Sequence, residues 1–129
     1  MAELPVIRLS PIEGTFSICQ FAPGEEPREM PRDGFLSVTR TDHEISVVCR
    51  SEVAPDAPRR EDGWALLKVE GPLDFGETGI LAKIATTLAG AEISIFAIST
   101  FDTDYILVKE ARVEDAIEAL RRSGIEVVE

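Results

Sequence analysis

Basic residues are scarce in this sequence of 129 residues, which has 13 Lys and Arg against 24 Asp and Glu and a formal net charge of -11. A protein this acidic repels phosphate groups, so we expect it to bind neither nucleic acid nor anionic lipid. No apolar run approaches the roughly 18 residues of a membrane span, and Met1–Pro5 lacks the basic region that opens a secretory signal. The sequence therefore predicts a cytoplasmic protein with no nucleic-acid or membrane partner.

Histidine and cysteine are also scarce. His43 is the single histidine and lies beside a predicted turn, so the Ser-His-Asp and Cys-His arrangements of nucleophilic enzymes have little support. A structural zinc ion needs about four ligands, more than His43, Cys19 and Cys49 supply. We expect no metal, no cofactor and no enzyme activity; a small hydrolase that uses the acids Asp102 and Asp104 is a weaker alternative.

The C-terminal half shows a clear alternation of strand and helix patterns. Its predicted elements are a strand over 64–70, a helix over about 78–89, strands over 93–99 and 104–110, a helix that begins near 113, and a strand over 125–128. Thr78 is expected to cap the first helix, Gly90 to take the left-handed conformation at its end, and Gly124 to end the second helix. The polar residues 100–103 are expected to form the turn of a β-hairpin.

The order of these elements, β-α-β-β-α-β, is that of a ferredoxin-like α+β unit with an antiparallel sheet. Right-handed crossovers in this topology place the first and second strands parallel, with another strand between them. The loop after the first strand and the hairpin after the second then emerge at the same edge of the sheet. We therefore expect residues 71–79 to face residues 99–104.

The N-terminal half resembles a reduced version of the same unit. Strands are predicted over 6–9, 16–21, 35–41 and 44–50, the last two joined by a turn at 42–43, and no amphipathic helix is evident. The polar, proline-rich residues 51–62 are expected to link this unit, residues 1–62, to a second unit over 63–129. Cys19 and Cys49 lie in apolar strand-like runs and are expected to be core residues, although a disulfide between them is left open.

Two segments carry chemistry suited to a small ligand. Gly76 and Gly79 flank the start of the first helix, where free N–H groups can bind a carboxylate. The hairpin segment around Ser99 offers hydroxyls, an aromatic ring and two acids, which can hold an ammonium or a cationic side chain. Together they suit a zwitterion. The same residue types also occur in ordinary turns, so an interaction module without a ligand is an alternative.

Two motifs in these segments resemble the ACT domain. They are Gly-Pro-Leu-Asp-Phe-Gly-x-x-Gly-Ile over 71–80 and Ser-Thr-Phe-x-Thr-Asp-Tyr-Ile-Leu-Val over 99–108. They are most similar to the small tandem ACT proteins of the cytosolic arginine-sensor type, and residues 34–41 and 44–49 resemble a degenerate first ACT unit. The resemblance implies a non-enzymatic regulatory protein that binds an amino acid or related metabolite where two ACT units meet.

The resemblance also implies site residues, with Asp104 as the partner of a cationic side chain. The positions carried over are Asp74, Gly79, Ile80, Thr100, Phe101 and Asp104, and Gly76 and Ser99 join them from the loop and the hairpin. The animal sensor has four ACT units, whereas this chain has room for two, so we expect a homodimer to complete the ligand site. The alternative is a structural dimerisation module that binds no metabolite.

Overall fold

The computed structural model describes residues 6–70 and 79–128. These residues form two compact units, one of residues 14–64 and one that joins the residues up to Glu13 to residues from Ala65 onward. The predicted division, 1–62 and 63–129, differs in that the start of the chain belongs with the C-terminal unit. Two long strands, β1 (Arg8–Phe21) and β4 (Arg59–Val69), contribute residues to both units.

The predicted order of strands and helices in the C-terminal unit is confirmed. After β4 come α1 (Ile80–Gly90), β5 (Phe96–Ser99), β6 (Asp104–Lys109), a short 3-10 helix η2 (Glu110–Arg112), α2 (Val113–Arg122) and β7 (Glu126–Val127). The sheet runs β4-β6-β5, so β6 lies between the first two strands of the motif, as expected. The hairpin is also confirmed, since β5 and β6 pair antiparallel with Ser99 opposite Asp104.

The start of β1 occupies a place in this sheet that the pattern of the C-terminal half does not predict. It pairs in parallel with β7, with Arg8 opposite Glu126 and Leu9 opposite Val127. On its other side, the Glu70 N–H donates to the Arg8 carbonyl oxygen over 2.8 Å. Ile7 and Leu9 are buried in the core of this unit, which is the physical reason that the segment belongs to it.

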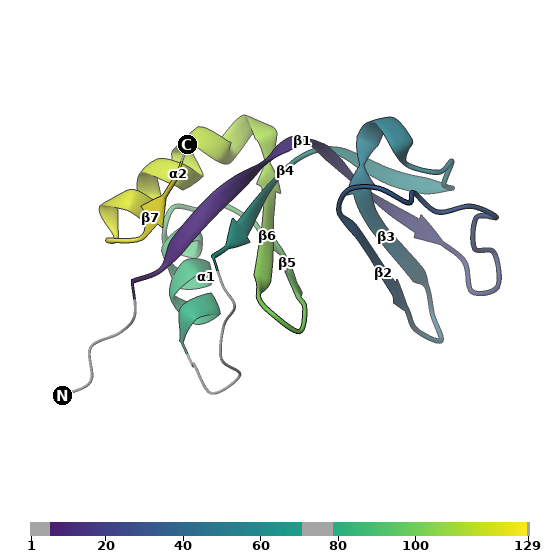
Figure 1. Ribbon diagram of the computed structural model, residues 1–129, viewed down its shortest axis with the longest axis horizontal. Coiled ribbons are helices and arrows are strands. Elements are labelled where there is room, and N and C mark those ends of the chain that lie inside the picture. The colour runs from purple at the N-terminus through teal and green to yellow at the C-terminus, as the bar shows by residue number, and fades with distance from the viewer. Residues whose placement is uncertain (1–5, 71–78, 129) are drawn as a thin grey trace. The chain divides into compact units, whose positions relative to one another are not determined.

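The core of the C-terminal unit lies between the sheet and its two helices, which pack against each other over one face of the sheet (Figure 1). The buried helix residues are Ile80, Ile84 and Leu88 of α1 and Ala116 and Leu120 of α2, and the buried strand residues facing them include Leu67, Val69, Ile106 and Val108. Each large apolar side chain buried in this way contributes about 1.5–3 kcal/mol. No helix in the described part of the chain is long and apolar enough to span a bilayer.

A residue in the left-handed conformation lies just beyond the C-terminus of each of the two helices, α1 and α2. Gly124 has φ 85° after α2, as predicted. After α1 the prediction is wrong, because Gly90 is still helical and Glu92 adopts φ 58°. The Ile93 N–H then donates to the Leu88 carbonyl oxygen over 2.9 Å, which closes the helix in a Schellman motif.

The N-terminal unit is a sheet with the strand order β2-β3-β1-β4, where β2 spans Leu36–Arg40 and β3 spans Ile45–Arg50. The predicted strands over 6–9 and 16–21 are parts of the single strand β1. The predicted linker is shorter than expected, because β4 already begins at Arg59. A 3-10 helix, η1 (Ser51–Val53), follows β3, and the described residues of this unit include no α-helix.

Cys19 and Cys49 belong to the small apolar core of the N-terminal unit, and both are free thiols. Cys49 lies opposite Ser17 and Cys19 lies opposite Val47, so the two cysteines are offset along the paired strands β1 and β3. Burial raises the pKa of both thiols, that of Cys49 to about 11. They are therefore poor nucleophiles at neutral pH, as expected of core residues.

Candidate ligand site at the start of α1 and the β5–β6 hairpin

The start of α1 and the turn between β5 and β6 lie at the same end of the C-terminal unit (Figure 1). This is the edge at which the predicted topology brings the loop and the hairpin together. Asp74 and Gly76 lie outside the described residues, together with the rest of 71–78. Their place in the site stays a prediction, whereas Gly79 and the whole hairpin can be described.

Hydrogen bonds between Thr100 and Thr103 close the turn of the hairpin. The Thr100 N–H donates to the Thr103 carbonyl oxygen over 2.8 Å, and the Thr100 hydroxyl donates to the same oxygen over 3.1 Å. The Thr103 N–H donates back to the Thr100 Oγ1 over 3.3 Å. These bonds give the turn a defined shape and fix the direction in which the flanking side chains leave it.

Asp104 lies on the side of the sheet that carries α1. Side chains alternate along a strand, so Asp104 shares a face with Ile106 and Val108, and these two pack in the same core as Ile80 of α1. The Ser99 hydroxyl donates to Asp104 Oδ1 over 2.5 Å, across the directly opposed pair of the hairpin. A half-buried carboxylate is thus held in place near the end of the unit where α1 begins.

The first turn of α1 offers the opposite charge. Gly79 precedes the helix with φ 89°, no side chain among the described residues caps it, and the first turn of the helix holds no acidic residue. The first N–H groups of a helix have no acceptor within it and form its positive end. None of the described residues has an atom within 4 Å of the position that a Cβ atom at Gly79 would take.

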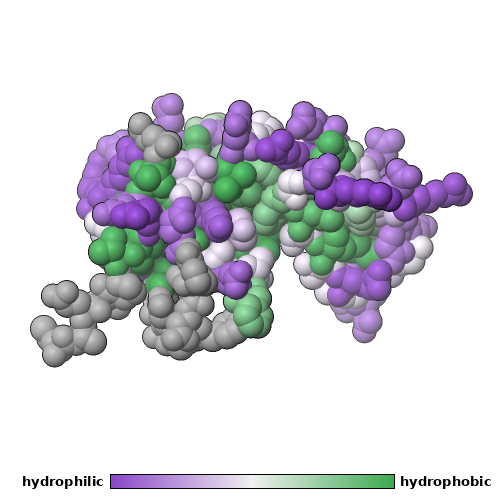
Figure 2. Space-filling view, in the orientation of Figure 1, coloured by the Kyte–Doolittle hydropathy of each residue, from purple (hydrophilic) through white to green (hydrophobic). Residues whose placement is uncertain are grey.

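Other predicted residues take different positions at this end of the unit. The side chain of Ile80 is buried in the core, so only its backbone N–H is available to a ligand. Phe101 is 81% exposed at the hairpin, and Figure 2 shows apolar surface at the tip of the hairpin. Ser99 and Thr100 are also exposed. The ligand contacts of all these residues remain predictions.

Thr103 is a residue that the sequence did not single out. Its side chain is buried and its hydroxyl donates to the carbonyl oxygen of Val69, the last residue of β4, over 2.5 Å. The bond joins the hairpin to the strand that leads into residues 71–79. A threonine within a polar turn carries no sequence signal for such a bond, because its partner lies 34 residues away.

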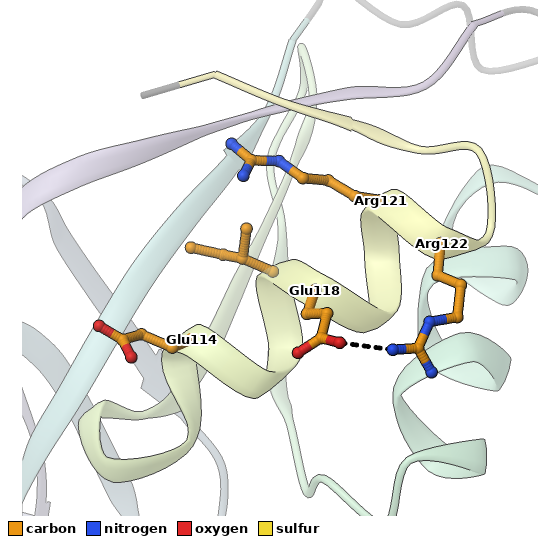
Figure 3. A pocket seen from close by; sticks show the side chains of 5 residues that line it. Glu114, Glu118, Arg121 and Arg122 are labelled. Atoms are coloured by element: carbon orange, nitrogen blue, oxygen red, sulfur yellow. Dashed lines mark hydrogen bonds and ion pairs between the residues drawn. The ribbon is translucent and has the colours of Figure 1, made fainter.

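A hollow of about 650 Å³ elsewhere on this unit lies along α2 and is lined by Glu114, Ile117, Glu118, Arg121 and Arg122. Glu118 and Arg122 form an ion pair, and Arg121 extends toward β7 (Figure 3), where it donates to the Val127 carbonyl oxygen over 2.8 Å. Most of the charged groups here are therefore engaged within the fold. The hollow shares no residue with the predicted site.

Two family models and several known proteins match this chain. The ACT-domain family model matches residues 59–122, and a second family model, described as an N-terminal domain, matches residues 14–57. The protein named cytosolic arginine sensor for mTORC1 subunit 1 is 47% identical over 60 residues in Homo sapiens, covering 46% of this chain and 18% of the sensor. The Mus musculus sensor is 34% identical over 121 residues, covering 93% of this chain and 30% of the sensor.

Solved structures show the same fold over nearly the whole chain. An Agrobacterium tumefaciens protein matches with a TM-score of 0.88 and 35% identity, covering 96% of this chain and 93% of that one. An aspartate kinase from Clostridium acetobutylicum, described as an allosteric enzyme, matches with a TM-score of 0.67 and 14% identity, covering 95% of this chain and 36% of that one. At that identity the kinase shows the fold alone. The chain spans less than a third of the arginine sensors it matches, and it belongs to the ACT-domain family.

Proposed function

We propose that this protein is a non-enzymatic regulatory protein that binds an amino acid. The site lies at the end of the C-terminal unit that holds the start of α1 and the turn between β5 and β6. The observation that carries the proposal is the placement of Asp104. Its carboxylate is held by Ser99 on the face that carries α1, and the N-terminus of this helix, which begins after Gly79, can offer N–H groups to an anion. One end of the site suits a carboxylate and the other suits a cation.

The ligand that fits this pair of charges best is a basic amino acid such as arginine. The α-carboxylate would lie at the first turn of α1, and the cationic side chain would pair with Asp104. Phe101, exposed in the turn that precedes Asp104, is a further predicted contact of the cation through its aromatic ring. The names of the relatives support this ligand, since the sensors that match most of this chain are called arginine sensors.

Titration with single amino acids tests the proposal. L-Arginine at about a hundred times its Kd should stabilise the native protein by about 2.7 kcal/mol, because it binds the folded state only. Thermal shift and calorimetry measure the effect. Asp104→Asn should remove it and leave the unliganded protein folded.

The matched control is Asp102→Asn, an equal loss of charge at an exposed position in the same turn. This variant should keep its affinity for arginine. A protein that no standard amino acid stabilises would contradict the proposed function, and equal affinities in both variants would remove Asp104 from the site.

The second candidate is a dimerisation module that binds no metabolite. Leu36 and Val38 favour it: they are partly exposed on β2, the edge strand of the N-terminal unit. Edge strands with apolar side chains commonly pair with another chain. A stable dimer that is indifferent to every amino acid would support this candidate over the first.

A further inference from the structure

Thr103 connects the β5–β6 hairpin to β4. The hydroxyl of Thr100 bonds within the turn itself, to the Thr103 carbonyl oxygen. The hydroxyl of Thr103 leaves the turn and donates to the carbonyl oxygen of Val69 over 2.5 Å. Thr103 is 5% exposed, so water does not compete for this bond.

The acceptor of this bond, the Val69 carbonyl oxygen, lies at the C-terminal end of β4. Val69 is the last residue of β4, and the next residue, Glu70, donates its N–H to the Arg8 carbonyl oxygen over 2.8 Å. The end of β4 is therefore held on one side by β1 and on the other by the hairpin. The residues that follow lead to Gly79 and to the first turn of α1.

The donor lies next to the acid of the candidate site. Asp104 follows Thr103 directly, and its carboxylate accepts from Ser99. Val69 packs in the same core as Ile80 of α1, so the bond from Thr103 to Val69 sets the position of Asp104 relative to the first turn of α1. Both charged ends of the proposed ligand depend on that position.

We propose that Thr103 is a positioning residue for ligand binding, which fixes the hairpin that carries Asp104 to the end of β4 and, through the core that Val69 shares with Ile80, relative to α1. The inference rests on the proposed function, because it assigns a role within that site. Thr103 itself is buried and need not touch the ligand. Its role is to keep the partner of the cationic group and the partner of the carboxylate at a constant separation.

The test compares Thr103→Val, which keeps the shape and loses the hydroxyl, with Thr103→Ser, which keeps the hydroxyl. Calorimetry with L-arginine, well below the melting temperature of every variant, gives Kd. The valine variant should bind about tenfold more weakly or worse, since small misplacements of binding groups are costly. The serine variant should bind within about twofold of the wild type.

Ile125→Val is the matched control for a loss of stability alone. Ile125 is buried in the core of the C-terminal unit, follows α2 and precedes β7 in the sequence, and takes no part in the hairpin. This variant should melt earlier and bind arginine as the wild type does. If its affinity falls as much as that of Thr103→Val, the effect follows general stability and the positioning role is overturned.

The remaining outcomes are also decisive. If the wild-type protein and the Thr103→Val variant bind arginine equally well, the role of Thr103 is overturned and the proposed function stands. Wild-type protein that does not bind arginine contradicts the proposed ligand, and the positioning role with it. Should Thr103→Val not fold, Thr103→Ala carries the same expectation; failure of both to fold means that the hydroxyl serves the fold and overturns the proposal.

Discussion

At the scale of single residues, α1 and α2 end in the same hydrogen-bond pattern with different residues in the left-handed position. Gly124 occupies it after α2 and Glu92 after α1, with φ 85° and 58°. Only glycine adopts this conformation without steric cost. The pattern of bonds is the same, with the Ile93 and Ile125 N–H groups donating to the Leu88 and Leu120 carbonyl oxygens.

Glu92→Gly should therefore stabilise the protein. We expect a gain of about 0.5–1 kcal/mol in the free energy of unfolding, because the strain at Glu92 is relieved. Urea denaturation followed by circular dichroism measures it. A change in the opposite direction at the equivalent position, Gly124→Ala, should lower the free energy of unfolding by about 1 kcal/mol. A Glu92→Gly variant that is no more stable than the wild type would contradict the explanation.

The buried thiol of Cys49 predicts a loss of stability in alkaline solution. Burial raises its pKa from 9.0 to about 11, with Cys19 adding to the shift and Arg60 opposing it. Because the pKa of the folded state lies above that of the unfolded chain, this stability is fully present below pH 9 and is lost as the pH rises through about 11.

We expect the free energy of unfolding to fall by about 2.7 kcal/mol over this range. Denaturant titrations at a series of pH values measure the slope. Cys49→Ala removes the titrating group and should flatten the curve. Equal slopes in the two proteins would show that Cys49 does not contribute.

At the scale of secondary-structure elements, local patterns predict much of the C-terminal unit. The period of the apolar residues predicts α2, where Ala116 and Leu120 are buried as expected. The polar run over 100–103 predicts the hairpin, and the strand order β4-β6-β5 follows from the handedness of the crossovers. Each of these signals acts over a few residues or through a general rule of chain topology.

No local pattern in the sequence predicts that the start of β1 pairs with β7. Its first residues pair with β7 across more than a hundred positions of sequence, with Arg8 bonded to Glu126. A short segment such as Ile7–Leu9, in which an apolar residue lies on either side of Arg8, predicts a strand but does not predict which strand it pairs with. Continuous strands also replace part of the predicted linker, because β4 begins at Arg59 among polar residues.

Leu9→Ala tests whether the start of the chain belongs to the C-terminal unit. Leu9 is fully buried in that core, so the variant should lose about 2–5 kcal/mol of stability. Leu36→Ala, on the exposed edge strand β2, should cost less than about 0.5 kcal/mol. Chemical denaturation of both proteins gives the comparison, and equal small losses would contradict the assignment of β1.

At the scale of the whole molecule, we expect a homodimer to complete the ligand site. The chain covers less than a third of the arginine sensors it matches, so a second copy would supply further units of the same kind. Light scattering coupled to gel filtration should report a mass of twice 14.1 kDa once L-arginine is bound. Tight binding by a protein that stays monomeric would mean that one chain holds a complete site.

The amino-acid sequence is sufficient for the helices, the hairpin and the chemical types of residue at the candidate site, because periodicity, turn chemistry and the rules of crossover all operate locally. Three features emerge only in the folded chain: the pairing of β1 with β7, the bond from Thr103 to Val69, and the left-handed conformation of Glu92. The first two join residues far apart in sequence. The third places glutamate where local preference favours glycine, and Glu92 keeps this conformation because Ile93, the next residue, packs in the core.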